Sequence, residues 1–166
     1  MIKPAFALAG LALGLAAGCS TTPEEAKVAE TYGTGQPAPQ MNLSSPSAYS
    51  FGETESRLRN AIETRGLTLF TTVDHAEGAQ EAGLKLASST LFVFGNPQAG
   101  TQLMQANPAM GIELPMKILV VETGNGVQVL WKDMPAMAER YGITGKDQLT
   151  SKISTTLQAI IDEATQ

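Results

Sequence analysis

The chain has 166 residues, with 11 lysines and arginines against 16 aspartates and glutamates, which gives a formal net charge of −5. This length suits one domain of ordinary size, and the acidic balance argues against nucleic acid as a partner. The single cysteine excludes an intrachain disulfide, and with only one histidine in the chain a conventional zinc site is not expected.

The first 19 residues have the pattern of an export signal. Lys3 precedes an apolar stretch over residues 5–17, and small residues then lead to Cys19. A cysteine in this place resembles the lipobox of bacterial lipoproteins, which implies a signal peptide over residues 1–18, cleavage after it and acylation of Cys19. Ser20 stands where an aspartate would favour the inner membrane, so we expect an outer-membrane lipoprotein that faces the periplasm. The alternatives are an ordinary signal peptide with a free cysteine and an uncleaved anchor.

Residues 20–47 are rich in proline, glycine and serine and have no apolar period. Such a composition cannot bury enough apolar surface to fold. We therefore expect residues 19–47 to be the lipidated cysteine and a disordered tether. A coil of this length has an end-to-end distance of roughly 30 Å, which would hold a domain close to the bilayer.

The chain from residue 48 to residue 95 shows alternating helix and strand signals. Ser50 and Glu53 have the spacing of a capping box, and Gly66 stands where a helix ends. Residues 67–73 alternate with the period of a strand. The expected elements are a strand at 48–49, a helix at 51–65, a strand at 67–73, a helical turn within 76–83 and a strand at 89–94.

The second half continues with a helix, a hairpin and two further helices. Asn96 is a favoured helix cap, Pro97 suits the first helical position, and Asn125-Gly126 is typical of a hairpin turn. Thr144 and Asp147 have the spacing of another capping box. The expected elements are a helix at 97–106, a loop, strands at 116–123 and 127–132, a short helix from 133 to 142 and a last helix over 144–166, with the apolar stripe Leu149, Ile153, Leu157, Ile160 and Ile161.

This order of elements predicts the fold class. The hairpin excludes an all-parallel sheet, and helices are interspersed with the strands. We therefore expect an α+β domain with a mixed, mostly antiparallel sheet of about five strands and helices packed on one face.

Several separate motifs occur in an order that resembles the domain of unknown function family 302 (DUF302). They are Ser50-Phe51, Arg65-Gly66-Leu67, Val73-Asp74-His75-Ala76, Leu91-Phe92-Val93-Phe94-Gly95-Asn96-Pro97, Gly111-Ile112, Leu114-Pro115-Met116-Lys117 and Ala138-Glu139-Arg140-Tyr141-Gly142. The resemblance covers about residues 47–143, so it implies a family domain at 48–143 with the last helix, 144–166, packed outside its usual extent. It also implies a compact α+β fold, often a homodimer, with no established activity.

Three positions could carry chemistry or bind a ligand. His75 follows Asp74 at a strand end and could act as an acid or base, a ligand or simply a packed side chain. Lys117, close in sequence to Glu113, could bind an anion or act as a nucleophile, or it could lie over the sheet as a surface lysine. Asn96 begins a helix whose free backbone donors could hold an anion, although its usual role is a cap.

Methionines are frequent in the domain. Met104 and Met110, together with His75, could suit monovalent copper, but methionine is also an ordinary core filler, and we expect no resident cofactor. No phosphate loop, dinucleotide fingerprint or nucleophile elbow is present. The sequence therefore favours a binding or accessory module for a small ligand or metal. An enzyme that uses His75 with Asp74, Glu113 or Lys117, and an envelope interaction module with an exposed apolar patch, are the alternatives.

Overall fold

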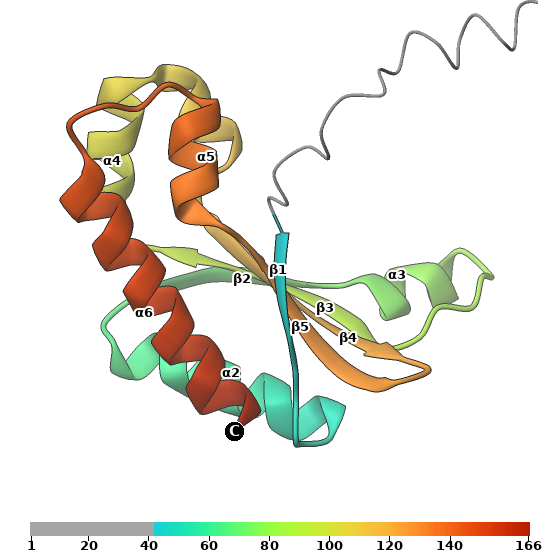
Figure 1. The fold of residues 1–166 in the computed structure, drawn as a ribbon. Coiled ribbons are helices and arrows are strands. Elements are labelled where there is room, and N and C mark those ends of the chain that lie inside the picture. The colour runs from blue at the N-terminus through green and yellow to red at the C-terminus, as the bar shows by residue number, and fades with distance from the viewer. Residues whose placement is uncertain (1–41) are drawn as a thin grey trace, which may run out of the picture. The chain divides into compact units, whose positions relative to one another are not determined.

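The computed structural model describes residues 42–166, which contain five strands in one sheet (Figure 1). The strand order is β1-β5-β4-β3-β2, and each of the four neighbouring pairs is antiparallel. The α+β class is confirmed, although within these residues the sheet is wholly antiparallel rather than mixed. The strands are β1 (Asn42–Pro46), β2 (Thr68–Asp74), β3 (Ser89–Gly95), β4 (Met116–Thr123) and β5 (Gly126–Lys132).

The helices follow most of the expected capping signals. The Ser50 hydroxyl accepts a hydrogen bond from the Glu53 amide, and the Asn96 side-chain oxygen accepts one from the Gln98 amide. None of the helices described is long and apolar enough to cross a membrane. Their bounds are α2 (Phe51–Thr64), α3 (His75–Glu81), α4 (Pro97–Ala106), the 3-10 helix η1 (Pro108–Ile112), α5 (Met134–Arg140) and α6 (Asp147–Thr165).

The start of the folded domain differs from the expectation. The predicted signal peptide and Cys19 lie outside the described residues, as does most of the predicted tether. The first strand is Asn42–Pro46 and not 48–49, so residues 42–46 belong to the sheet and not to the tether. This strand is polar and ends in proline, a composition typical of a loop, and the sheet tolerates it because β1 lies at an edge beside β5.

Two local predictions in the second half were also wrong or incomplete. The capping box at Thr144 and Asp147 does not form, because the chain turns at Gly145, whose φ is +69°, and Lys146 takes the cap position of α6 without a side-chain hydrogen bond. The expected loop after α4 contains η1, where the Asn107 side chain accepts a hydrogen bond from the Ala109 amide. A single turn of this kind leaves no apolar period in the sequence.

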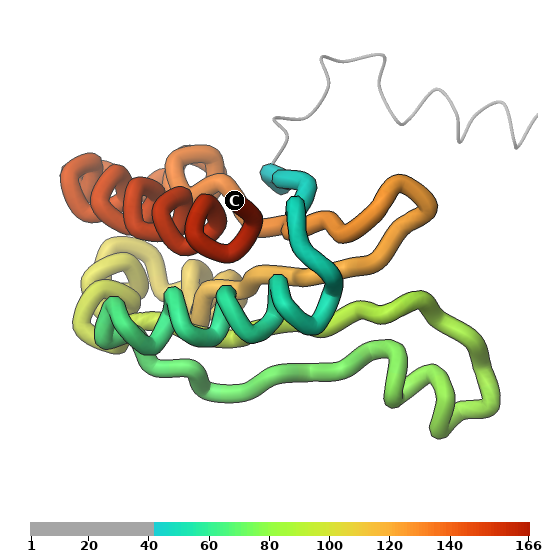
Figure 2. Tube along the Cα trace, turned by 90° about the horizontal axis from the view of Figure 1, so that it is seen from below, coloured from blue at the N-terminus to red at the C-terminus, as the bar shows by residue number. Residues whose placement is uncertain are grey.

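The core lies between the sheet and the helices. Side chains of β3, β4 and β5 alternate between fully buried and half-buried, so one face of the sheet is covered by helices and the other is more open. On the covered side, α6 packs against both α2 and α5 (Figures 1 and 2). The largest fully buried side chains are Phe92, Phe94, Leu58, Ile62, Leu103, Met110, Ile118, Met134, Met137, Ile160, Ile161 and Val120.

The open face of the sheet carries an apolar row. Val73 pairs with Leu91, Leu91 with Leu119 and Leu119 with Leu130, so the four side chains lie side by side across four strands. Val73 is 41% exposed and the other three are half-buried. The sheet is therefore amphipathic only in part, and its second face is less polar than that of an ordinary solvated sheet.

The core assignment predicts a contrast between two phenylalanines. Phe92 is 0% exposed and Phe70 is 50% exposed. Phe92→Ala should lower the free energy of unfolding by about 3–5 kcal/mol, because it removes buried area and leaves a cavity. Phe70→Ala is the matched control and should cost less than about 1 kcal/mol. Urea unfolding followed by circular dichroism measures both, and equal losses for the two variants would contradict this placement of the core.

Candidate functional site

A groove of about 580 Å³ lies between α4 and α6, at the end of the sheet where β3 ends and β4 begins. This volume is typical of sites for small molecules. Most of its lining is apolar, and the exposed side chains of Phe70 and Met104 lie at its border with solvent. The apolar lining comprises Leu67, Phe70, Phe94, Pro97, Leu103, Met104, Leu114, Pro115, Met116, Leu149, Ile153, Leu157 and Ile160.

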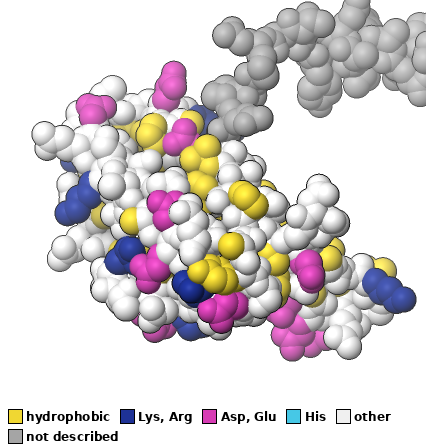
Figure 3. Space-filling model, turned by 60° about the horizontal axis from the view of Figure 1, so that its bottom comes forward, with side chains coloured by type: hydrophobic (Ala, Val, Ile, Leu, Met, Phe, Trp, Pro, Cys, Tyr) yellow, Lys and Arg dark blue, Asp and Glu magenta, His cyan; other side chains and the backbone are white. Residues whose placement is uncertain are grey.

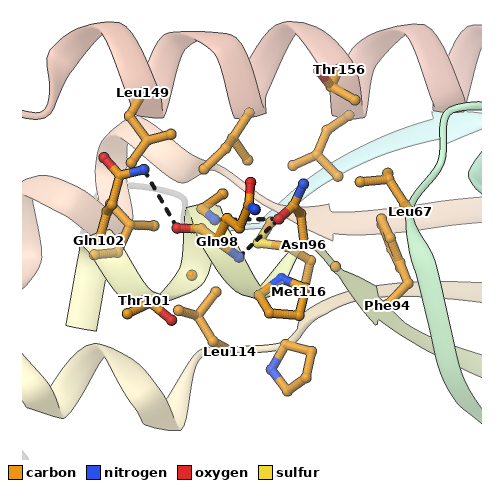
Figure 4. A pocket seen from close by; sticks show the side chains of 18 of the residues that line it. Leu67, Phe94, Asn96, Gln98, Thr101, Gln102, Leu114, Met116, Leu149 and Thr156 are labelled. Atoms are coloured by element: carbon orange, nitrogen blue, oxygen red, sulfur yellow. Dashed lines mark hydrogen bonds between the residues drawn. The ribbon is translucent and has the colours of Figure 1, made fainter. Parts of the chain in front are cut away.

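Helices α4 and α6 form the two long sides of the groove. Figure 4 shows Leu149 and Thr156 on α6 facing the residues of α4, with Leu67 and Phe94 at one end of the groove. α4 packs against η1, whereas α6 packs against α2 and α5. The groove therefore exists because the two helices that line it are fixed by different neighbours.

Asn96 lines the groove, but its side chain acts as a helix cap. Its oxygen accepts hydrogen bonds from the amides of Gln98 and Ala99, at 2.9 and 3.4 Å. These amides are the donors that would otherwise hold an anion at the start of α4. The expected ligand-binding residue Asn96 is thus part of the site, while its polar atoms are engaged in starting the helix.

Lys117 shapes the groove from behind. Its ammonium donates to the backbone carbonyl oxygens of Glu113 and Pro115, each at 3.0 Å. The segment between these carbonyls carries Leu114 and Pro115, which line the groove and are joined by a cis peptide bond. Lys117 therefore holds the lining segment in place and does not itself line the groove.

Glu113 is the centre of a polar cluster beside this segment. Its carboxylate accepts hydrogen bonds from Lys132 at 2.6 Å and from the Tyr141 hydroxyl at 2.9 Å. The Glu113 side chain is 12% exposed and that of Lys132 is 40% exposed. The cluster links the end of η1 to β5 and to the end of α5, so it positions the same segment that Lys117 holds.

The charges of the cluster shift its pKa values in directions that follow from these contacts. The Lys132 hydrogen bond holds the pKa of the Glu113 carboxyl below its usual range, although partial burial of the carboxyl opposes this. Burial lowers the pKa of the Lys117 ammonium; the Glu113 charge opposes this shift and the Lys132 charge adds to it. The hydrogen bond to Glu113 raises the pKa of the Tyr141 hydroxyl.

His75 and Asp74 lie apart from this cluster. Asp74 caps α3, its carboxylate accepting a hydrogen bond from the Glu77 amide at 2.9 Å, and His75 is the exposed first residue of that helix. Asp74 of β2 pairs with Thr90 of β3, and Lys117 of β4 pairs with Val93 of β3. Asp74 and Lys117 therefore lie on opposite sides of β3, and their partners are about 10 Å apart along that strand. The structure therefore does not bring His75 together with Glu113 or Lys117.

Asp74 lines a smaller polar hollow of about 370 Å³ with Glu55, Ser56, Arg59, Thr72 and Thr90. His75 lines neither this hollow nor the groove. Of the copper candidates, Met104 and Met110 belong to α4 and to η1, which packs against it, whereas His75 begins α3 at the opposite end of the sheet from α4 (Figures 1 and 2). The Met104 sulfur lies near Gly111, and Met110 is fully buried in the core. Within residues 42–166 no three histidine, cysteine, aspartate or glutamate side chains are grouped as metal ligands.

Sequence reasoning missed the α6 side of the groove. Leu149 and Ile153 belong to the apolar stripe predicted for the last helix, and a stripe of this kind indicates burial in a core. Lys152 and Thr156 lie beside that stripe and carry no recognisable motif. The only signal was that Lys152 and Thr156 are spaced as neighbours on one helix face, which alone does not separate a ligand site from an ordinary surface.

The charges of the domain are mixed. On the face shown in Figure 3, lysine and arginine side chains lie singly among acidic ones and form no continuous basic area. Among the residues of 42–166 that line the groove, Lys152 is the one charged residue. The site is thus an apolar groove with a single positive charge.

A one-sided antiparallel sheet with an apolar groove between two of its helices defines a small α+β domain. The family model described as "Domain of unknown function DUF302" matches residues 43–164, so the chain belongs to the DUF302 family. The match extends beyond the range 47–143 indicated by the motifs and includes most of α6. Because α6 lines the groove, both sides of the groove lie within the family domain.

Three relatives are named as ion channels. The chain is 42% identical over 98 residues to "Fluoride-specific ion channel FluC 1" of Brucella suis, over 58% of this chain and 39% of that protein. The matches to FluC 1 of Brucella abortus and FluC 2 of Brucella melitensis are also 42% identical over 98 residues and cover 36% of each. The chain thus matches less than two fifths of the length of each of these three relatives.

A solved structure shares the fold. The crystal structure of an uncharacterized DUF302 protein from Bacillus stearothermophilus matches with a TM-score of 0.68 at 18% identity, over 75% of this chain and 98% of that one. Since the fold makes up nearly all of that protein, it forms without an additional domain. The compact unit Pro39–Gln166 contains the complete buried core of the described residues.

The lowered pKa of Glu113 predicts a pH-dependent contribution to stability. This contribution is present above the pKa of an unfolded glutamate, about 4.3, and is lost as the pH falls through the lower pKa of the folded state. Glu113→Gln should therefore unfold about 1 kcal/mol more easily than the wild type at neutral pH, a modest value because Lys132 is partly open to solvent. Urea unfolding over a pH series should show this difference shrinking in acid. A difference that stays constant down to about pH 3 would contradict the assignment.

Proposed function

We propose that this protein is a lipid-anchored module of the bacterial envelope that binds a small, largely apolar molecule in the groove between α4 and α6. The groove is the single observation that carries the proposal. It has the volume of a small-molecule site, and its lining comes from elements that are fixed independently of any ligand. A largely preformed groove binds at a lower entropic cost than a site that must be assembled.

The lining of the groove supports binding more than catalysis. Its polar side chains are Asn96, Gln98, Gln102, Lys152 and the two threonines 101 and 156. Among the described residues that line it there is no histidine, cysteine, aspartate or glutamate, and the one ionisable side chain is Lys152, four residues before Thr156 on α6. Glu113 and Lys117 adjoin the lining residues Leu114 and Met116 in the sequence, but both are engaged in holding the lining segment.

The membrane setting rests on the sequence and on the Brucella relatives. The pattern from Lys3 to Cys19 supports cleavage and lipidation, and Ser20 supports the outer membrane facing the periplasm. In the relatives a region similar to this chain is part of proteins named as ion channels. We infer that domains of this type act next to a membrane, where apolar small molecules concentrate, and that here a lipid on Cys19 provides the attachment.

Filling the groove should abolish binding without unfolding the domain. Thr156 is half-buried and lines the groove, whereas Thr155 on the same helix is exposed and does not. In the segment Pro39–Gln166, Thr156→Trp should weaken binding of the neutral fluorescent probe N-phenyl-1-naphthylamine by about tenfold or more, because the indole occupies the space of the ligand. Thr155→Trp is the matched control and should bind like the wild type.

Thermal unfolding by circular dichroism provides the folding control for both tryptophan variants. If the folded Thr156→Trp variant and the wild type bind the probe equally, the groove is not the binding site and the proposal fails. If the wild type binds no probe from this class, the proposal also fails.

Lipidation predicts a specific mass and a specific location for the full chain. The mature protein should begin at Cys19, carry the mass of attached acyl chains and fractionate with outer membranes. Cys19→Ser should lose the acyl mass and the cleavage after residue 18. Intact mass spectrometry and membrane fractionation of cells that express each form test this. A wild-type chain that is cleaved but carries an unmodified Cys19 would instead support the ordinary signal peptide.

A further inference from the structure

The groove contains one charged side chain, and that side chain has no ionic partner in the described part of the chain. Lys152 lies on the face of α6 that lines the groove, three residues after Leu149 and four before Thr156. It forms no ion pair within residues 42–166. The residues three and four positions away on either side of it are Leu149, Gln148, Thr155 and Thr156, which carry no charge.

The location of Lys152 matters because of what surrounds it. Its neighbour Ile153 is partly buried against the core and also lines the groove. A lysine in such a position lays its aliphatic stem along the apolar lining and keeps its ammonium at the border with water. The groove therefore offers a long apolar surface with one positive charge at its edge.

This combination selects a ligand by its charge as well as by its apolar body. The chain is acidic overall, with a net charge of −5, and yet Lys152 is the only charged residue among the described residues that line the groove. A ligand with a negative group placed at Lys152 gains an attractive interaction, whereas a positive group would meet repulsion. A neutral ligand would gain only from burial of its apolar body.

We propose that the groove binds a single-chain amphiphile with one anionic headgroup, such as a fatty acid carboxylate, with the headgroup at Lys152 and the chain along Leu149, Ile153 and Leu114. The inference rests on the proposed function and names the ligand class of the same groove. The Lys152 ammonium donates to the carboxylate. The bound chain replaces water against the apolar lining.

The test compares two ligands of the same chain length on the segment Pro39–Gln166. Laurate carries the carboxylate and 1-dodecanol lacks the charge, and both are used below the concentrations at which they aggregate. Competition with N-phenyl-1-naphthylamine gives the affinity of each. Lys152→Gln should weaken laurate binding by about twofold to fivefold and leave dodecanol binding unchanged, because an ion pair open to water is worth up to about 1 kcal/mol.

Two control variants test whether the effect depends on a positive charge at position 152. Lys152→Arg keeps the charge and should retain laurate binding, and Lys85→Gln removes an exposed lysine that does not line the groove and should change neither ligand. Salt should weaken laurate binding to the wild type by screening the ion pair. Dodecanol binding should not weaken with salt.

The possible outcomes separate the two proposals. If both ligands bind, Thr156→Trp weakens both and Lys152→Gln weakens neither, the groove binds apolar molecules but the anionic class is wrong. If neither ligand nor the probe binds the wild type, the groove proposal fails and this inference fails with it. A selective loss of laurate in Lys152→Gln supports both.

Discussion

The packing of α6 against α2 is the contact on which the rest of the described structure depends. The two helices pack against each other; α6 buries Leu157, Ile160 and Ile161 in its second half, and α2 buries Leu58 and Ile62. Arg65 at the end of α2 reinforces this contact, with an ion pair to Glu163 at 2.8 Å and a hydrogen bond to the Ala159 carbonyl. α2 contacts β2 and β4, and α6 contacts β1, so these two helices together hold much of the covered face of the sheet.

The same contact determines where the groove lies. Because α6 is fixed to α2 by its second half and to α5 beside it, its first half extends past α4 and does not close onto it. α4 is fixed by its cap at Asn96 and by η1 after it. The space left between them is lined by Leu114 and Pro115, whose backbone Lys117 holds from the far side. The groove is therefore a consequence of packing elsewhere, which explains how it can be preformed.

The sequence predicted the elements whose signals are local. The cap at Ser50 and the strand at Ser89–Gly95 were identified because each has a short-range chemical cause. The edge strand Asn42–Pro46 was missed because its pairing with β5 spans most of the domain and its residues have no strand preference. Leu149 and Ile153 were identified only as part of the apolar stripe of the last helix, because such a stripe does not reveal whether the facing surface is another helix or a groove.

The candidate site also contains residues that the sequence identified and residues that only the structure revealed. Asn96 and Lys117 were selected from sequence and do lie at or behind the groove, although one is a cap and the other holds the lining segment. His75 was selected because it is the only histidine, and the structure places it on the surface at the far end of the sheet. Lys152 was not selected, because a lysine on a helix is an ordinary surface residue in the sequence. Only its place beside the apolar groove marks it as a candidate ligand-binding residue.

Occupation of the groove between α4 and α6 by a ligand is tested most directly by NMR mapping of laurate binding to the segment Pro39–Gln166. The amide chemical shifts that change should form one group, on residues 97–104 of α4, 114–116 and 149–157 of α6. Changes centred on the open face of the sheet, at residues 117–121 and 128–132, would place the ligand outside the groove, and an unchanged spectrum would show that laurate does not bind; either result contradicts binding in the groove.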